Sequence, residues 1–254
     1  MRIALTREVS PAIVDCELTH LPRRPIDFAT ARAQHCGYQD TLRRLGCEVR
    51  SLPADPALPD SVFVEDTAVV FDELAVIARP GAASRRSETR ATAEALAPYR
   101  PLGHIEPPGT LDGGDVLRIG PTVFVGQTSR TNQAAIDQLT AALASHGYVV
   151  QAVAVRGCLH LKSAVTAVAP GTVLCNPRWV DPEAFADMRV LEVDPAEPHA
   201  ANGLLVGDRV VYPVGFPATA RRLAAQGIAL AQVDVSELQK AEGAVTCCSL
   251  VFEA

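Results

Sequence analysis

Three side chains that lie far apart in the chain, Cys247, His160 and Asp112, have the types needed for nucleophilic catalysis. A thiolate is a strong nucleophile at neutral pH, but a cysteine needs a base to activate it, and that base needs a carboxylate to orient it. Of the six histidines, His160 is the one at the start of a predicted strand, and Asp112 precedes another. These residues predict cysteine-based catalysis, provided that the fold brings them together.

The seven cysteines are odd in number, and no Cys-x-x-Cys pair occurs. This pattern argues against a disulfide framework and against a structural zinc site. Cys247 and Cys248 stand at the beginning of an apolar strand that we predict over residues 245–252. Because neighbouring side chains of a strand point to opposite faces, one of the two would face the site and the other the core.

A repeated strand–strand–helix–strand pattern predicts the elements that position these residues. The clearest copy has strands at 116–119 and 122–126, a helix at 132–146 and a strand at 148–155. Further copies begin near residues 66, 161 and 203. A fifth copy is completed only by joining the strand at 245–252 to a strand at 3–6, a helix at 28–45 and a strand at 47–52.

Units of about 40–50 residues that close into a ring predict a radial α/β arrangement. An open doubly wound sheet is the alternative, although no G-x-G-x-x-G follows a strand. In a radial fold, equivalent strand ends converge on the central axis. Four polar clusters precede strands in this way and predict a shared site: Glu65–Asp66, Asp112–Asp115, His160–Lys162 and Thr246–Cys247.

Composition excludes several classes of protein. The chain has 254 residues, of which 48% are apolar and 20% charged, and this balance is typical of a globular protein. The net charge is −6 and no long basic run occurs, which argues against a nucleic-acid partner. The first apolar run is too short for a signal peptide, and no stretch approaches the length of a membrane span. We therefore expect a cytoplasmic protein without a membrane partner.

Six segments, taken in order along the chain, resemble the signature of the dimethylarginine dimethylaminohydrolase family. They are PDSVFVED at 59–66, RPGAASRR at 79–86, LDGGDVL at 111–117, SRTN at 129–132, LHLKS at 159–163 and GAVTCCSL at 243–250. Together they extend over most of the chain. The resemblance implies the five-bladed α/β propeller of the guanidine-modifying enzymes, as a single catalytic domain over residues 1–254. Its blade number agrees with the repeat count.

The resemblance also implies a role for each matching position. Cys247 would be the nucleophile, His160 the general acid and base, and Asp112 its acidic partner. The positions implied for substrate binding are an acidic lining for the guanidinium (Asp60, Glu65 and Asp66), two arginines for the substrate carboxylate (Arg85 and Arg130), a flap residue (Leu18), and two residues near the amino-acid end (Ala241 and Glu242). Relatives often have a larger apolar residue and an aspartate where Ala241 and Glu242 stand.

The implied reaction is hydrolysis of asymmetric dimethylarginine or monomethylarginine to citrulline and dimethylamine or methylamine. It would pass through an S-alkylthiouronium on Cys247, with no cofactor and no metal; zinc would act only as an inhibitor at Cys247 and His160. The expected partner is a small molecule, methylated L-arginine, and the chain is expected to be a monomer or a homodimer.

Three other functions remain open at this stage. An arginine or agmatine deiminase uses the same residue types, but arginine deiminases usually carry an inserted helical domain, and the pair Arg85 and Arg130 favours a substrate with a carboxylate. A non-catalytic arginine-binding protein would not need Cys247, His160 and Asp112 together. A zinc hydrolase would need closely spaced ligands that the chain lacks.

Overall fold

The computed structural model describes residues 1–254, and its strands form five separate sheets of three strands each. In every sheet the middle strand is antiparallel to one neighbour and parallel to the other. This shared pattern confirms the predicted repeat and excludes the single open sheet that was its alternative.

One sheet is built from segments distant in sequence. Strand β1 (Arg2–Arg7) lies between β15 (Leu250–Glu253), to which it is antiparallel, and β2 (Glu48–Leu52), to which it is parallel. Helix α1 (Phe28–Arg44) connects β1 to β2. It begins at Asp27, whose carboxylate accepts a hydrogen bond from the backbone N–H of Thr30, as an N-cap residue does.

The other four sheets follow one another along the chain. Their strands are β3 (Ala68–Val70), β4 (Ala75–Ile77) and β5 (Leu102–His104); β6 (Val116–Ile119), β7 (Thr122–Gln127) and β8 (Val149–Ala154); β9 (Val165–Ala169), β10 (Thr172–Cys175) and β11 (Arg189–Glu192); and β12 (Leu204–Val206), β13 (Arg209–Pro213) and β14 (Ala229–Val233). Three of the returns to the parallel strand contain α2 (Thr89–Leu96), α3 (Gln133–Leu143) and α5 (Pro217–Ala225), and the fourth contains a 3₁₀ turn at Pro182–Phe185.

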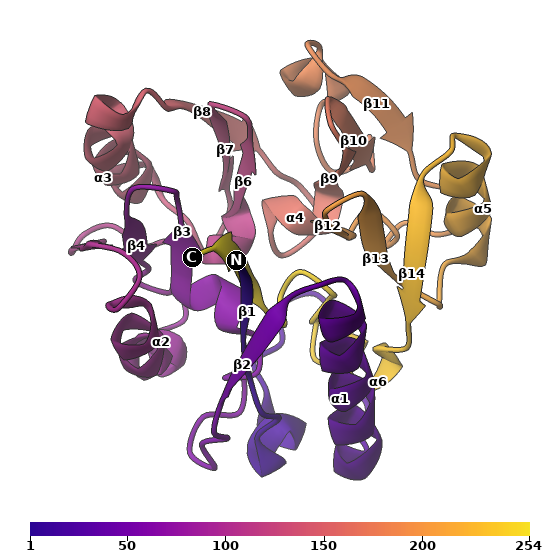
Figure 1. The fold of residues 1–254 in the computed structure, drawn as a ribbon, viewed down its shortest axis with the longest axis horizontal. Coiled ribbons are helices and arrows are strands. Elements are labelled where there is room, and N and C mark those ends of the chain that lie inside the picture. The colour runs from indigo at the N-terminus through magenta and orange to yellow at the C-terminus, as the bar shows by residue number, and fades with distance from the viewer.

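Figure 1 shows the five sheets arranged in a ring, with α1, α2, α3 and α5 on its outer side. Helix α3 illustrates why. Its residues Ile136, Leu139 and Leu143 are buried and lie on one face of the helix, and they belong to an apolar cluster with residues of β6 and β7. Gly147 follows the helix with φ of 78°, a left-handed conformation that favours glycine. The helix thus covers the outer part of its own sheet.

Short helices and turns lie between these elements. They are α4 (Leu161–Ala164), α6 (Ser236–Gln239) and 3₁₀ helices at Pro11–Asp15, Val64–Thr67, Ala83–Glu88, Gly113–Asp115 and Ala144–His146. The strand predicted over 245–252 is wrong in its first half, because β15 begins only at Leu250. The backbone N–H of Thr246 donates to Asn202 Oδ1 at 3.1 Å, and the carbonyl of Cys247 accepts from the N–H of Glu65 at 3.1 Å. Partners from neighbouring units therefore replace a strand ladder in this turn.

This turn also changes the expectation for the paired cysteines. Strand alternation does not separate Cys247 and Cys248, since neither lies in a strand. Both are buried, and both belong to the largest apolar cluster of the molecule.

Candidate active site

The predicted polar clusters occupy equivalent places in four units. Each lies in a short helix or turn directly before the first strand of its sheet: Val64–Thr67 before β3, Gly113–Asp115 before β6, α4 before β9, and the turn 243–249 before β15. The corresponding place before β12 holds Asn202, which is buried and donates to Thr246 Oγ1 at 3.0 Å. Sequence reasoning missed Asn202 because no charged residue marks its position.

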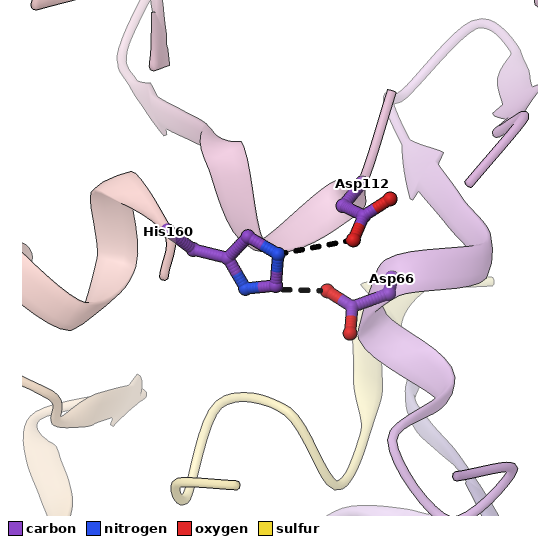
Figure 2. A group of neighbouring side chains, drawn as sticks. All are labelled: Asp66, Asp112 and His160. Atoms are coloured by element: carbon purple, nitrogen blue, oxygen red, sulfur yellow. Dashed lines mark hydrogen bonds and ion pairs between the residues drawn. The ribbon is translucent and has the colours of Figure 1, made fainter. Parts of the chain in front are cut away.

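The imidazole of His160 faces two carboxylates that come from different units (Figure 2). Its Nε2 is 3.1 Å from Asp112 Oδ2, and its Nδ1 is 3.8 Å from Asp66 Oδ1. All three residues are buried. A Cβ added at Gly114 would come within 2.6 Å of His160 Nδ1, so the close approach of this loop to the imidazole requires glycine.

Charge keeps the imidazole protonated over a wide pH range. Burial acts to lower the pKa of His160, but the negative charges of Asp66 and Asp115 and the hydrogen bond to Asp112 outweigh it and raise the pKa to about 9. Burial likewise acts to raise the pKa of Asp66, but the positive charges of His160 and Arg85 prevail and lower it. The resting site therefore contains an imidazolium held by carboxylates.

Cys247 lines a small cavity together with His160 and Asp66. Burial and the negative charges of the nearby carboxylates Glu65 and Asp66 raise the pKa of the Cys247 thiol well above its usual value. A bound cation would reverse the charge contribution and favour the thiolate. A positively charged ligand would thus favour ionisation of Cys247.

The cavity offers only about 20 Å³ to a water-sized sphere, which is room for one or two water molecules. Besides Cys247, His160 and Asp66, the predicted residues that line it are Asp60, Arg85, Arg130, Ala241 and Glu242. Leu18, Glu65 and Asp112 do not line it; the carboxylate of Asp112 is behind the imidazole.

A segment formed by residues 17–21, here called the lid, is bound to residues that line the cavity, and Glu17 itself lines it. The N–H of Glu17 donates to both oxygens of Asp60, at 3.1 and 3.2 Å. The N–H groups of Thr19, His20 and Leu21 all donate to the carboxylate of Glu242. The carboxylate of Glu242 therefore binds the lid, and its place near the amino-acid end of a substrate stays a prediction.

Leu18 lies within the lid and packs against the largest apolar cluster, and its role as a flap residue stays a prediction. Arg130 is also bound to the lid, because its Nη2 donates to Thr19 Oγ1 at 3.0 Å. Its other terminal nitrogen lies 3.8 Å from Asp112 Oδ2. This guanidinium has few strong partners and could exchange the Thr19 hydroxyl for a ligand carboxylate.

Arg85 differs from Arg130 in this respect. Its Nη1 lies 2.6 Å from Asp66 Oδ2, and its Nε and Nη2 donate to the carboxylate of Glu88. Nη2 also donates to the carbonyls of Asp60 and Phe63. These bonds leave one N–H of Nη1 without a partner. Arg85 lines the cavity, but it can donate only this one N–H to a ligand carboxylate and cannot bind it bidentately.

Glu65 faces away from this cavity. Its Oε1 lies 2.5 Å from Lys162 Nζ, and its Oε2 accepts from Thr246 Oγ1 at 2.7 Å. These three residues line a second cavity of about 520 Å³. The ion pair thus belongs to the lining of the second cavity, and Glu65 acts on Cys247 through charge.

Sequence reasoning assigned no individual role to four buried or half-buried residues of the site, although two of them lay within the predicted polar clusters: Glu88, Asp115, Lys162 and Asn202. A signal existed for two of them, since Asp115 and Lys162 lie within the segments 111–117 and 159–163 that carry the family resemblance. One side-chain nitrogen or oxygen from each of Asp66, Asp112 and His160 lies within 4.8 Å of the others, a spacing that could suit a metal ion. The hydrogen bond and the ion pair among these residues account for this spacing. A zinc ion at Cys247 and His160 stays a prediction.

Comparison with known proteins agrees with this geometry. The arginine deiminase family model matches residues 55–203. A dimethylarginine dimethylaminohydrolase of Streptomyces coelicolor is 45% identical over 251 residues, which cover 97% of this chain and 95% of that protein. The enzyme of the same name from Pseudomonas aeruginosa is 36% identical over 228 residues, which cover 89% of this chain and 90% of that one. No helix of the present chain has the length and apolarity needed to span a membrane.

Solved structures agree as well. A Cys-to-Ser mutant of the Pseudomonas aeruginosa enzyme, complexed with citrulline, superposes with a TM-score of 0.91 at 33% identity and 98% coverage of both chains. An adduct of a dimethylarginine dimethylaminohydrolase with S-methyl-L-thiocitrulline gives 0.92 at 34% identity, covering 99% of this chain and 100% of the other. A domain of a cyanobacterial arginine dihydrolase, at 18% identity and a TM-score of 0.88, shares the fold.

These findings define first an enzyme class, the hydrolases that act on guanidino C–N bonds. The chain belongs to the arginine deiminase family and, within it, to the dimethylarginine dimethylaminohydrolases.

Proposed function

We propose that this protein hydrolyses asymmetric dimethylarginine and monomethylarginine to citrulline plus dimethylamine or methylamine. The observation that carries the proposal is that His160, held by the buried carboxylate of Asp112, lines an acidic cavity together with Cys247. A guanidinium is planar and positively charged, so its carbon is a poor electrophile until carboxylates hold it beside a strong nucleophile. Asp66 and Asp60 supply such carboxylates in the cavity.

The first half of the reaction forms a covalent intermediate. The bound guanidinium favours ionisation of Cys247, whose thiol proton passes to solvent, and the thiolate Sγ then attacks the central carbon. His160, protonated in the resting site, gives its proton to the methylated nitrogen, and the C–N bond breaks. Dimethylamine or methylamine leaves, and an S-alkylthiouronium remains on Cys247.

The second half releases citrulline. The neutral imidazole of His160 takes a proton from water, and the oxygen of that water adds to the thiouronium carbon. The C–S bond then breaks, the electron pair returns to sulfur, and the extra proton of the product passes to the Cys247 thiolate, which restores the thiol and leaves neutral citrulline. His160 is again protonated, and Asp112 holds the ring in one orientation throughout.

The amino-acid end of the substrate would lie beneath the lid. We propose that its carboxylate takes the place of the Thr19 hydroxyl on Arg130, and that Arg85 contributes the one N–H that its partners leave available. Ala241 and Glu242 would border the amino-acid end, and Leu18 would cover it. Because the closed cavity is too small for a methylarginine, the lid must open for the substrate to enter.

We further propose that the five sheets are the blades of one pseudo-symmetric α/β propeller, and that residues 1–254 form a single catalytic domain. Support comes from the same strand order in each sheet. The proposed chemistry uses only Cys247, His160 and carboxylates, so it requires no metal or cofactor at any step. We also propose a cytoplasmic location and a monomer or homodimer.

The test is citrulline release from asymmetric dimethylarginine by the purified, chelator-treated protein, with Cys247→Ser as the matched variant and arginine as the competing substrate. The expected result is citrulline and dimethylamine from the wild type, none from the variant, and little from arginine. Faster turnover of arginine would assign the chain to the deiminases, which share its family model. No product from any guanidine would support a binding protein on the same scaffold.

A further inference from the structure

Asp115 is a fully buried carboxylate that the reaction above does not use. Its two oxygens accept hydrogen bonds from different parts of the site. Oδ1 accepts from the backbone N–H of Leu161 at 2.9 Å, and Oδ2 accepts from Thr128 Oγ1 at 2.7 Å. Burial raises the pKa of Asp115 to about 6, so at neutral pH the group is mostly ionised and both oxygens are acceptors.

The first bond leads to His160. Leu161 is the next residue, so its N–H belongs to the peptide group that contains the carbonyl of His160, and this peptide begins α4. Holding that peptide limits how the imidazole can turn about its own backbone. The carboxylate of Asp115 passes close to Gly126 of β7 where it accepts from Leu161, and a Cβ at Gly126 would lie 2.8 Å from Asp115 Oδ1. The contact therefore depends on a glycine at position 126.

The second bond leads to Arg130. Thr128 Oγ1 donates to Asp115 and accepts from the N–H groups of Arg130 and Thr131, at 3.0 and 3.2 Å. Thr131 Oγ1 in turn accepts from the N–H of Asp112 at 3.2 Å. The loop that carries Arg130 is thus oriented by the threonine hydroxyl, and the hydroxyl is oriented by Asp115.

We propose that Asp115 is a positioning residue that fixes the acid–base His160 and the carboxylate-binding Arg130 to one buried carboxylate. The two side chains act on opposite ends of a methylarginine, so a common anchor sets the distance between the reacting carbon and the substrate carboxylate. Small displacements of a bound substrate reduce rates strongly, which gives this anchor a direct effect on turnover. The roles assigned to His160 and Arg130 rest on the proposed function.

Three variants separate the two branches. Asp115→Ala removes both, Thr128→Val removes only the branch to Arg130, and Thr128→Ser keeps the hydroxyl and serves as the matched control. Amide hydrogen exchange, read residue by residue by NMR, tests the contacts without any activity. Because a hydrogen bond contributes about 0.5–1.5 kcal/mol, Asp115→Ala should speed exchange at Leu161 by about 2- to 10-fold. Thr128→Val should speed it at Arg130 and Thr131 and leave Leu161 unchanged.

Kinetics with asymmetric dimethylarginine test the consequence. Thr128→Val should raise KM about 2- to 10-fold with kcat near that of the wild type, and Thr128→Ser should restore KM. Asp115→Ala should lower kcat as well, by about 10-fold or more. If Asp115→Ala does not fold, the two threonine variants still decide. The proposal is overturned by unchanged exchange at Leu161 in a folded Asp115→Ala, or by an unchanged KM in Thr128→Val. Altered exchange in a protein whose wild type turns over no guanidine would instead refute the proposed function.

Discussion

The bond between Glu242 and the lid predicts how strongly a single carboxylate keeps the site closed. In Glu242→Gln, one oxygen remains to accept from the lid, but the other becomes an NH₂ group that faces backbone N–H donors. Hydrogen bonds to charged groups contribute about 1.5–3 kcal/mol, and partial exposure of the Thr19 and His20 contacts reduces this. We therefore expect lid opening to become easier by about 1–2 kcal/mol, or about 5- to 30-fold.

The assay is amide hydrogen exchange at Thr19, His20 and Leu21, whose N–H groups bind Glu242 in the closed lid. Glu237→Gln is the matched control, because Glu237 accepts from Lys240 and from the N–H of Asp27, outside the lid. Exchange at the three lid amides should rise in Glu242→Gln alone. Equal rates in the wild type and both variants would show that Glu242 does not hold the lid, and would refute the reasoning.

Three further predictions concern stability. The pKa of His160 rises from 6.5 to about 9 on folding, so the stabilisation from its protonation is complete below pH 6.5 and is lost as pH rises through 9. In urea unfolding, the difference in the free energy of unfolding between wild type and His160→Gln should therefore shrink by up to about 3 kcal/mol from pH 6 to pH 9.5. Burial lowers the pKa of His35 to about 4, so the wild type loses stability as pH falls from 6.5 to 4. The free energy of unfolding of His35→Leu should therefore rise relative to that of the wild type by up to about 3 kcal/mol between pH 8 and pH 4, and a constant difference would contradict this. Gly37 lies in the exposed part of α1 with no atom near a new Cβ, so Gly37→Ala should stabilise the folded protein by about 0.5–1 kcal/mol. Gly113→Ala would place its Cβ 1.9 Å from the carbonyl oxygen of Glu65 and should destabilise the folded protein by about 3 kcal/mol or more. Thermal unfolding measures both effects.

The hairpins were the most predictable part of the fold. The strand predicted at 116–119 agrees with β6 at both ends, and that at 122–126 with all but the last residue of β7, because Gly120–Pro121 marks the turn between two apolar runs. Helices α4 and α6 were missed, since four residues are too few to show a helical period. The apolar run 245–249 has the composition of a strand, yet hydrogen bonds to Asn202 and Glu65 hold it as a turn.

The site shows a similar division. That His160 and Asp112 meet could be predicted from their equivalent places in successive units and from the family resemblance. The direction of individual side chains could not, because it depends on partners that are remote in sequence. Lys162 and Thr246 turn Glu65 away from the small cavity, Glu88 and Asp66 occupy most of the Arg85 guanidinium, and the lid amides bind Glu242.

The pairing of β1 with β15 has a consequence for the order of folding. Four sheets use strands that are near one another in the chain, whereas this one joins Arg2 to Glu253 and Leu5 to Leu250. The entropy cost of bringing two chain segments together grows with the length of the loop between them, so this is the most expensive contact to form early. Cys247 lies three residues before β15. Cys247 should therefore reach His160 only in the last step of folding, and partly folded chains should have formed sheets but no complete site.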